Sequence, residues 1–395
     1  MRILQVCPIF PPEKGEFAGG VTQEVHDFSK ELVNKGHEVD IYCSNTLDLK
    51  HKTAKKHALI DGINVHYFNY IAHFYTFFVT PSLIPAVKKN LSNFDIVHIH
   101  DFRTFEAAAI SHYARQMGVP YVLQTNGGVL RMGNMLTKVG KMLFDLASGN
   151  NMLAGAQKVI AGCETEVSEY KIMGVTQDKI TIIPPAYDVQ EFVTLPPRGQ
   201  FRQRYNITTE HIILFLGRIH KIKGIDFLVK SFNELAGKRD DVLLVIVGPD
   251  DGFKSTLLKL TNELGLRNKV LFTGALHGSD KLSALVDATM LVQTSLYERG
   301  PGSPFEAVLC GTPIIVTRDT GAGEIAEKAD AGILVNYGNI EELTIAMNNI
   351  IVNHSVAATR TLKARDYIIA NYSFEKLTAK YINLYRSIIE SGRSL

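Results

Sequence analysis

The chain has 395 residues, which is more than one hydrophobic core usually serves, so we expect two domains of about 180–200 residues each. Apolar residues make up 46% and charged residues 21%, as in an ordinary soluble globular protein. The net charge is +2 and no long basic run is present, which excludes a protein that binds nucleic acid by neutralising many phosphates.

Short apolar runs alternate with stretches of helical period along the first half of the chain. The expected strands are residues 3–10, 38–43, 63–68, 95–100, 121–125, 158–161 and 180–184, and the expected helices are 21–35 and 104–116. A second series has strands at 211–218, 242–247, 269–273, 290–294, 313–317 and 332–335 and helices at 224–236, 254–264, 280–287, 303–310 and 340–353. This alternation predicts an α/β protein with parallel sheets and helices on both faces.

The two series are separated by residues 184–199, the only Pro-dense stretch in mid-chain. We therefore predict an N-terminal domain at residues 1–195 and a C-terminal domain at residues 196–371. Ligands of open parallel sheets bind outside the carboxyl ends of the strands. Two such domains facing each other would form a cleft lined by the loops that follow their strands.

The cysteines predict a reducing compartment, because they lie far apart in apolar runs with no Cys-x-x-Cys pair and no zinc spacing. They are Cys7, Cys43, Cys163 and Cys310. The chain enters a strand at once, without the charged and apolar regions of a signal peptide. We expect a cytoplasmic protein.

Residues 65–87 contain no Asp, Glu, Lys or Arg, but Asn69, Pro81 and Pro85 interrupt them, so they do not predict a membrane-spanning helix. Basic residues then alternate with apolar ones in two nearby segments. The basic residues are Lys88, Lys89, Arg131, Lys138 and Lys141, and the apolar ones are Leu130, Met132, Met135, Leu136, Met142, Leu143 and Phe144. Such mixtures predict peripheral contact with an anionic membrane at the inner face of the cell membrane, and ordinary core helices with solvated lysines are the alternative.

Three loops of the first half could hold a ligand. Gly19 and Gly20 precede a helix and permit close backbone approach to a phosphate or sugar, although a simple flexible turn would look the same. His98 and His100 share one face of a strand, with His100 at its carboxyl end, where it could contact a reacting hydroxyl or serve a structural role. The next strand ends in Asn126-Gly127-Gly128, another polar tip on the same edge.

In the second half, Arg218 and Lys223 flank a turn that opens a helix after a strand, and Gly248 follows the next strand. A guanidinium and an ammonium at a helix start suit a diphosphate, whereas solvated loop residues are the alternative. No Asp-x-Asp pair occurs in the chain, so the usual site for a metal bound to a diphosphate is missing. We expect no metal and no cofactor, with Arg218 and Lys223 neutralising the diphosphate.

The loop between Glu298 and Glu306 is the most informative segment. A proline and two glycines break regular structure there, so both carboxylates could face a polyhydroxylated ligand at a helix start. The alternative is that Ser303-Pro304-Phe305-Glu306 forms a capping box with proline at the first helical position.

These motifs, in this order, resemble the retaining glycosyltransferases of the GT-B fold, and most of all family four, which includes sucrose synthases and phosphatidylinositol mannosyltransferases. The likeness rests on the Gly19-Gly20-Val21 loop, His98-x-His100, Gly217-Arg218 with Lys223-Gly224, Val247-Gly248, and Glu298-x(7)-Glu306 followed by Cys310-Gly311-x-Pro313. It covers essentially the whole chain. It implies two Rossmann-like domains facing across a cleft, with residues 372–395 as a C-terminal helix that packs back on the first domain.

The resemblance also implies a reaction and residue roles. A hexosyl unit would move from a UDP- or GDP-linked sugar to a hydroxyl of a glycan or lipid-linked acceptor, with retention of anomeric configuration. Arg218 and Lys223 would hold the diphosphate, Glu298 the transferred sugar and Glu306 the ribose. Backbone N–H groups of Gly302, Ser303, Pro304 and Phe305 would meet sugar and phosphate, Gly19, Gly20 and Gly248 would lie close to the donor, and His100 and Asn126 would lie on the acceptor side.

The sequence departs from the family pattern at two places. Many relatives have a histidine where Asn126 stands, and an amide can hydrogen-bond to an acceptor but cannot transfer a proton. Glu298 is followed by Arg299 and Gly300, where many relatives have a shorter apolar run, so sugar selectivity is expected to differ.

Two other functions remain open from sequence. A sugar-nucleotide epimerase or hydrolase on the same fold would consume donor without an acceptor. A two-domain binding protein without chemistry would bind a ligand and release it unchanged, but such proteins are usually secreted.

Overall fold

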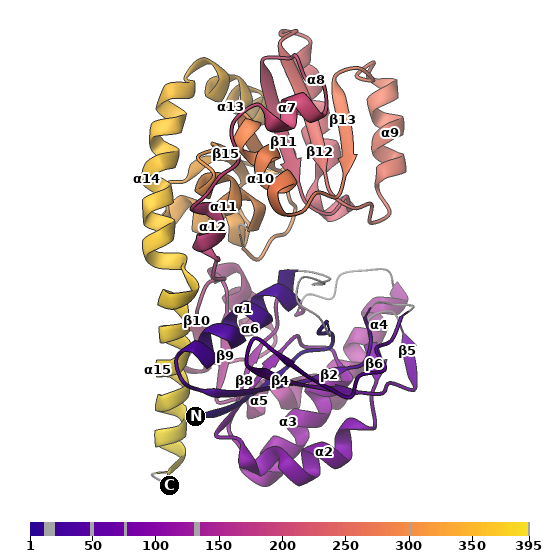
Figure 1. Cartoon of the computed structure of the whole chain (residues 1–395). Coiled ribbons are helices and arrows are strands. Elements are labelled where there is room, and N and C mark those ends of the chain that lie inside the picture. Colours follow the sequence, from indigo (N-terminus) through magenta and orange to yellow (C-terminus); the bar gives the residue numbers. More distant parts are fainter. Residues whose placement is uncertain (12–19, 48–50, 75–76, 130–134, 301, 394–395) are drawn as a thin grey trace. The chain divides into compact units, whose positions relative to one another are not determined.

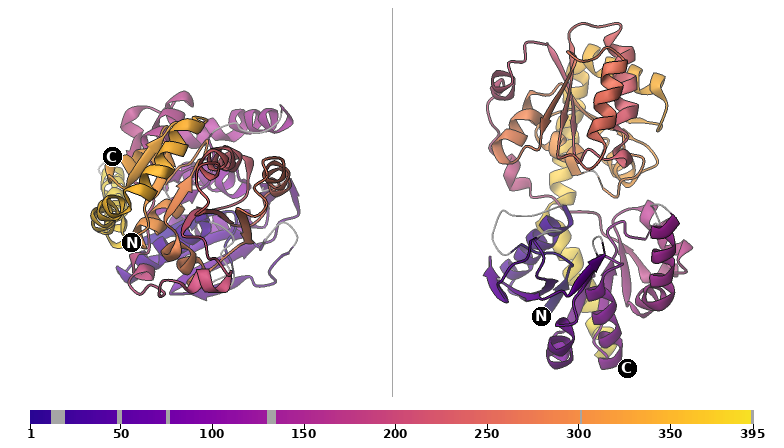
Figure 2. Two further views of the ribbon diagram at one scale, coloured as in Figure 1. Left: turned by 90° about the horizontal axis from the view of Figure 1, so that it is seen from above. Right: turned by 90° about the vertical axis from the view of Figure 1, so that its right-hand side faces the viewer.

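The structure is a computed structural model that describes residues 1–11, 20–47, 51–74, 77–129, 135–300 and 302–393. Its contacts divide the chain into two compact units. Unit 1 comprises Met1–Tyr187 and Phe374–Leu395, and unit 2 comprises Asp188–Ser373. Each unit is built on one large sheet with helices on both sides of it (Figures 1 and 2). The predicted α/β class with two Rossmann-like parts is confirmed.

Unit 1 alternates strands and helices, with an extra hairpin after its fourth strand. Its strands are β1 (Arg2–Val6), β2 (Glu38–Ser44), β3 (His57–Ile60), β4 (Ile63–Phe68), β5 (Ala72–Phe74), β6 (Phe77–Val79), β7 (Ile96–His100), β8 (Tyr121–Gln124), β9 (Lys158–Ala161) and β10 (Ile180–Ile182). Its helices are α1 (Gly20–Asn34), α2 (Leu83–Asn90), α3 (Phe105–Met117), α4 (Met135–Phe144), α5 (Asn150–Gly155), α6 (Glu164–Ile172) and α15 (Phe374–Arg393).

The unit 1 sheet has the order β10-β9-β8-β7-β1-β2-β4-β3, and its pairs are parallel except for the edge strand β3. Its central strands are buried on both faces, which explains their continuous apolar runs. One face packs on α2, α3 and α5, and the other packs on α1 and α15, which contributes Leu377 and Ile382. The C-terminal helix is therefore part of the unit 1 core.

Unit 2 repeats the same arrangement. Its strands are β11 (His211–Leu216), β12 (Val242–Val247), β13 (Val270–Gly274), β14 (Met290–Gln293), β15 (Ile314–Thr317) and β16 (Gly332–Val335). Its helices are α7 (Gln200–Arg204), α8 (Ile225–Ala236), α9 (Lys254–Glu263), α10 (Gly278–Asp287), α11 (Gly302–Leu309), α12 (Gly321–Lys328), α13 (Ile340–Val352) and α14 (His354–Tyr372). The sheet is parallel throughout, in the order β13-β12-β11-β14-β15-β16.

Most expected strands occur within a residue or two of their predicted bounds, but the first is shorter. The prediction of a strand at residues 3–10 is wrong beyond Val6. Pro8 has no backbone N–H to donate to a sheet, so the chain leaves the ladder before it. The polar and aromatic segment after β4 forms the β5–β6 hairpin, which was not predicted, and α2, which agrees with the alternative of a core helix with solvated lysines.

Within the part of the chain that the structure describes, no helix combines the length and apolar character needed to cross a membrane. The uncharged residues 65–87 are divided among β4, the hairpin and α2. All four cysteines are buried and unbridged, and burial raises the pKa of the Cys7 and Cys43 thiols well above its ordinary value.

One carboxyl group lies entirely inside unit 1. Glu106, in the first turn of α3, has no exposed surface and accepts a hydrogen bond of 2.6 Å from the Thr80 hydroxyl. Burial raises the pKa of Glu106 to about 7; the Thr80 bond opposes this shift, and the charge of Asp101 adds to it. A carboxyl group whose pKa is higher in the folded state than in the unfolded state stabilises the fold at low pH. This stabilisation is lost as the pH rises through the folded-state pKa.

We predict that Glu106→Gln gains stability relative to the parent protein between pH 5 and pH 8, because only the parent must bury a carboxylate at the higher pH. The pKa shift sets an upper limit of about 3 kcal/mol on this relative gain. Urea unfolding of both proteins at the two pH values measures it. The amide oxygen that the substitution introduces can still accept the Thr80 bond, so a stability difference that does not change with pH would contradict the raised pKa.

Candidate functional site

The strand order of unit 2 identifies the sheet edge where a ligand should bind. From β11 the chain moves outward to β12 and β13, and then returns to place β14 on the other side of β11. The loops that follow β11 and β14 therefore diverge, which leaves a crevice at the carboxyl ends of these two strands. Arg218 and Lys223 follow β11, and Glu298 follows β14.

Gly248 lets the ends of β11 and β12 approach each other. It has φ of 149°, and a Cβ atom at this position would lie 1.8 Å from the carbonyl oxygen of Gly217. The Gly217 N–H donates to the Val247 carbonyl at 2.9 Å, and the Ile219 N–H donates to the Pro249 carbonyl at 2.8 Å. These bonds fix the backbone on both sides of Arg218, so a side chain at Gly248 would push the two strand ends apart.

The ammonium group of Lys223 and the carboxylate of Glu298 form an ion pair at the switch between β11 and β14. Lys223 Nζ lies 2.5 Å from Glu298 Oε2, and both side chains are mostly buried. Gln293 Nε2 and the Ser295 hydroxyl donate to the same oxygen at 2.9 Å and 3.2 Å. Three donors thus hold Oε2, while no described residue donates to Oε1, which can accept hydrogen bonds from a ligand.

A glycine and a threonine join the two loops that carry this ion pair. The Thr294 hydroxyl donates to the Gly224 carbonyl at 2.9 Å, and the Leu296 N–H donates to the Ile222 carbonyl at 2.8 Å. A Cβ atom on Gly224 would lie 2.1 Å from the Thr294 carbonyl oxygen. The backbone therefore holds together the two loops that carry Lys223 and Glu298.

Arg218 has a different acidic partner. Its guanidinium forms an ion pair with Asp251, in the loop after β12, and its side chain is 62% exposed. An exposed pair of this kind contributes little to stability. The guanidinium is therefore able to exchange Asp251 for an anionic ligand at low cost.

Glu306 faces α10. Its Oε1 lies 3.1 Å from Lys281 Nζ. Burial by itself would lower the pKa of the Lys281 ammonium, but Glu306 outweighs that effect and raises the pKa above its ordinary value. Glu298 and Glu306 are thus held by different lysines on different elements.

The alternative of a capping box at Ser303 is wrong. Helix α11 begins at Gly302, so Ser303 and Pro304 lie inside its first turn. The Ser303 hydroxyl lies 2.7 Å from the Leu216 carbonyl oxygen and 2.8 Å from Gln293 Oε1, and its single proton is shared between these two acceptors. It therefore ties α11 to the ends of β11 and β14. Phe305 is buried against the Tyr372 ring at 5.5 Å.

Pro304 also corrects the predicted set of backbone donors, because proline has no N–H. The residues of this set that have an N–H are Gly302, Ser303 and Phe305. The Gly302 N–H already donates to the Gly300 carbonyl at 3.1 Å.

In unit 1 the histidines lie at a second switch point, between β1 and β7. His100 Nε2 lies 2.7 Å from Gln5 Oε1, and its ring stacks on that of His98 at 3.9 Å. His98 Nδ1 lies 2.7 Å from the Tyr385 hydroxyl of α15. Burial and the neighbouring His100 hold the pKa of His98 well below its ordinary value, so His98 is neutral at pH 7. This side-chain network fixes the orientation of His100.

His100 also lines a small pocket at the carboxyl edge of the unit 1 sheet, with Gln124 and Tyr381. The Tyr381 hydroxyl donates to Gln124 Oε1 at 3.0 Å, and Gln124 Nε2 donates to Glu24 at 3.3 Å. These polar groups give the pocket hydrogen-bonding capacity, and α15 forms one of its walls.

The Asn126 tip is shaped by two consecutive left-handed residues. Asn126 has φ of 52° and Gly127 has φ of 78°, and asparagine tolerates this conformation better than most residues. The Gly127 N–H donates to buried Glu166 at 2.7 Å. Arg103 donates to the Val129 carbonyl at 3.0 Å and forms a paired contact with Asp145 at 2.8 Å.

The predicted glycine loop after β1 is described only in part. Gly20 is the exposed first residue of α1, and a Cβ atom there would have open space around it. Gly19 lies outside the described residues.

Two family models match adjoining parts of the chain. The model described as glycosyl transferases group 1 matches residues 197–370, and that described as glycosyltransferase family 4 matches residues 18–191. The chain belongs to the group 1 glycosyltransferases. Solved structures with the same fold agree with this assignment.

This glycosyltransferase is similar over nearly its full length to several curated proteins. It is 25% identical to an uncharacterised glycosyltransferase of Methanocaldococcus jannaschii, with 99% of each chain covered. It is 22% identical to the GDP-mannose-dependent α-(1-6)-phosphatidylinositol monomannoside mannosyltransferase of Mycobacterium tuberculosis, with 98% of each chain covered.

Two solved structures share the GT-B fold of this glycosyltransferase. Sucrose-phosphate synthase from Thermosynechococcus elongatus superposes with a TM-score of 0.79 at 18% identity, covering 99% of this chain and 100% of the other. Anabaena HepE in complex with UDP and glucose superposes with a TM-score of 0.76 at 18% identity, covering 98% and 100%.

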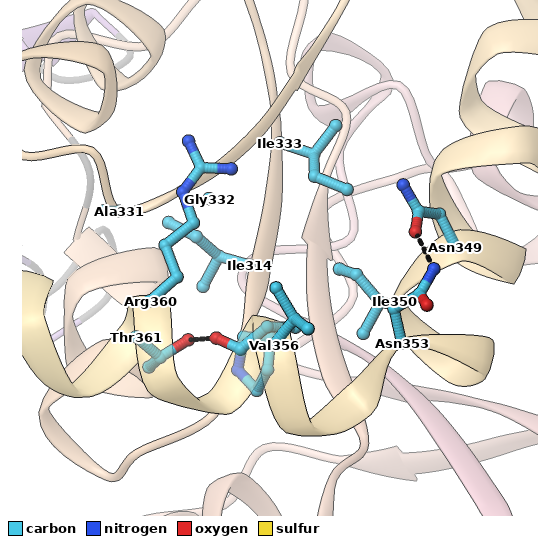
Figure 3. A pocket seen from close by; sticks show the side chains of 12 residues that line it. Ile314, Ala331, Gly332, Ile333, Asn349, Ile350, Asn353, Val356, Arg360 and Thr361 are labelled. Atoms are coloured by element: carbon cyan, nitrogen blue, oxygen red, sulfur yellow. Dashed lines mark hydrogen bonds between the residues drawn. The ribbon is translucent and has the colours of Figure 1, made fainter.

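Another pocket of the glycosyltransferase lies at the opposite edge of the unit 2 sheet. Figure 3 shows it beside Ile314 and Gly332, the first residues of β15 and β16, with Arg360 and Thr361 of α14 nearby. Its walls are largely apolar, and it lies at the amino ends of the strands, so it is separate from the edge that carries Lys223 and Glu298.

Sequence reasoning missed the residues that hold the candidate side chains in place. These residues are Gln5, Arg103, Asp145, Glu166, Asp251, Lys281, Gln293 and Ser295. Only Gln293 and Ser295 had a usable signal, because they lie next to the end of a predicted strand. The others come from distant parts of the chain.

Proposed function

We propose that the protein is a retaining, metal-independent hexosyltransferase that moves a hexosyl unit from a UDP- or GDP-linked sugar to a hydroxyl acceptor. Unit 2 supplies the residues that bind the donor, and unit 1 supplies those on the acceptor side. The acceptor is a glycan or glycolipid of cell-surface polysaccharide biosynthesis, and the enzyme works in the cytoplasm at the inner face of the cell membrane.

The observation that carries this proposal is the Lys223–Glu298 pair at the strand switch, with Arg218 on the same turn. A nucleotide diphosphate sugar has a doubly charged diphosphate next to a ring of hydroxyl groups. Lys223 and Arg218 match the first part, and the open oxygen of Glu298 matches the second. One ligand would thus use both members of the pair.

The proposed roles of the cations extend to the leaving group. The bond between the anomeric carbon and the diphosphate oxygen breaks, and the acceptor oxygen bonds to that carbon on the same face. The acceptor's proton passes to the leaving phosphate oxygen. Arg218 and Lys223 stabilise the negative charge that develops on the diphosphate, which is the main demand of such a reaction.

The remaining donor contacts follow from the same geometry. Glu306 accepts hydrogen bonds from the ribose hydroxyls, with Lys281 holding its carboxylate. In the proposed complex Gly248 keeps the ends of β11 and β12 close together beside the donor, and the N–H groups of Ser303 and Phe305, at the start of α11, donate to its phosphate or sugar. Pro304 can contribute only apolar contact.

On the acceptor side, His100 lines the small pocket of unit 1 and suits hydrogen bonding to a hydroxyl, and Asn126 offers an amide at the neighbouring strand end. Support for a glycolipid comes from the mycobacterial relative, whose name states a phosphatidylinositol monomannoside acceptor. The four buried, unbridged thiols are compatible with a cytoplasmic location.

A panel of UDP and GDP sugars tests the proposed function. We expect one donor to raise the melting temperature most, and to be consumed in the presence of an acceptor with the anomeric configuration kept, as read by NMR of the product. Release of free sugar or of an epimer from donor alone would favour the hydrolase or epimerase, and binding without turnover over a broad acceptor panel would favour a binding protein.

We predict that Arg218→Ala weakens donor binding by about 10- to 100-fold, because a hydrogen-bonded ion contact with a diphosphate is worth about 1.5–3 kcal/mol. Calorimetric titration with the selected donor measures the dissociation constant. Arg360→Ala is the matched control, since Arg360 also forms an exposed ion pair, with Asp330, at the other sheet edge. Equal affinities for parent and Arg218→Ala would disprove the diphosphate role.

We predict that Glu306→Ala lowers donor affinity at least tenfold, whereas Lys281→Met lowers it much less, because only Glu306 contacts the ribose. Both substitutions remove the same ion pair, so their melting temperatures should fall by similar amounts. Thermal unfolding and donor titration of the two variants separate the roles. If the two variants lose affinity equally, Glu306 serves only to pair with Lys281.

A further inference from the structure

Helix α4 of unit 1 exposes its apolar side chains. It contains no buried residue, although its sequence is rich in large apolar side chains. Met135 is 77% exposed, Leu136 82% and Leu143 58%, and Leu146 just beyond the helix is 66% exposed. A surface helix of a globular protein normally turns such residues toward the core. A contiguous exposed set of this kind marks an interaction surface.

The apolar residues of α4 form one stripe. At about 100° per residue, Met135, Leu136, Val139, Met142 and Leu143 fall within an arc of about 120°. Phe144 lies on the other side of the helix, where its ring contacts those of Phe77 and Phe102 at 6.0 Å and 6.3 Å. The helix is thus attached to the unit by its narrower apolar side and presents the wider one outward.

A second element adds apolar groups at the same end of unit 1. The β5–β6 hairpin contacts α4 through Phe77 and Phe144, and Figure 1 draws the two elements next to each other. Phe74 of β5 is 71% exposed and Ile71, just before it, is 74% exposed. The hairpin segment thus exposes a further aromatic and a further aliphatic side chain near α4, and such side chains are typical of those that enter the interface of a bilayer.

The charges beside the stripe are positive. Helix α4 contains Lys138 and Lys141 and no Asp or Glu, and Lys138 is exposed at the edge of the stripe. The nearest carboxylate in sequence, Asp145, is buried and paired with Arg103. Lys88 and Lys89, which the sequence grouped with this segment, lie on α2, away from α4 (Figure 1).

We propose that the exposed stripe of α4, together with Ile71 and Phe74, docks the protein on an anionic lipid bilayer. The helix lies in the plane of the interface, with Leu136 and Leu143 among the acyl chains and Lys138 near the lipid phosphates. A second copy of the chain fits this surface less well, because a twofold contact between stripes would bring the two Lys138 side chains together.

The bilayer surface would be joined to the acceptor side of unit 1. Asp145, directly after α4, binds Arg103, and the same guanidinium donates to the Val129 carbonyl in the loop that carries Asn126. A lipid-linked hydroxyl in the membrane would therefore lie on the α4 side of this loop. This last step rests on the proposed function, whereas the docking surface itself rests only on the packing and charge of α4.

Co-sedimentation of the full chain with vesicles of phosphatidylcholine, with and without phosphatidylglycerol, tests the surface. We expect binding only when phosphatidylglycerol is present, and weaker binding as salt is added. The double variant Leu136→Glu and Leu143→Glu should bind at least tenfold more weakly with an unchanged melting temperature. Ile172→Glu, which changes an 83% exposed residue on α6, is the matched control and should bind like the parent.

Absence of binding at low salt, or equal binding by the double variant and the parent, would overturn the proposal. If the parent instead self-associates in sedimentation velocity, the double variant does not, and neither binds vesicles, the stripe is a protein interface and the proposal is wrong. Transfer to a soluble acceptor should be the same in the parent and the double variant, so loss of docking is distinguishable from failure of the proposed activity.

Discussion

The reversal of strand order between β11 and β14 is the constraint on which the unit 2 site depends. Because the strand order reverses there, the loops after these strands diverge, and open parallel sheets bind their ligands at such a point. The backbone contacts around Gly224 then bring the loop of Lys223 to the loop of Glu298, and the close approach at Gly248 holds the backbone beside Arg218. A charged pair could not keep this geometry on mobile loops, since its own attraction is too weak to order them.

In the structure, each proposed donor-binding charge has a protein partner of opposite sign. Lys223 has Glu298, Arg218 has Asp251, and Glu306 has Lys281. Such pairs keep the charges compensated before a ligand arrives. They also orient the side chains, so that binding requires exchange of partners and little new ordering. The exposed Arg218–Asp251 pair is the easiest to exchange, whereas the Lys223–Glu298 pair is mostly buried and is braced by Gln293 and Ser295.

Unit 1 uses the same sheet topology for different chemistry. Its switch point holds stacked, buried histidines in place of lysine and arginine, and Tyr381 and Tyr385 of the C-terminal helix complete their hydrogen-bond network. Residues at the far end of the chain thus orient side chains near its beginning. Elsewhere on the unit, α4 places its broad apolar stripe outside the core, where it forms the proposed docking surface for a bilayer.

The sequence by itself determined the βα alternation, the parallel sheets and the loops that carry Arg218, Lys223, Glu298 and Glu306, because period and turn residues act locally. The same local signals were weaker where proline and aromatic residues competed, so the β5–β6 hairpin was missed, and α2 was considered only as the alternative of a core helix with solvated lysines. Only the tertiary structure decided which charges meet. Lys223 and Glu298 are far apart in the sequence, and Ser303 turns to β11 and Gln293 instead of capping its helix. The tertiary structure also decided that the α4 stripe is exposed, because a helix with this pattern can pack either face against the core. The contacts of Phe144 with Phe77 and Phe102 determine which face packs inward.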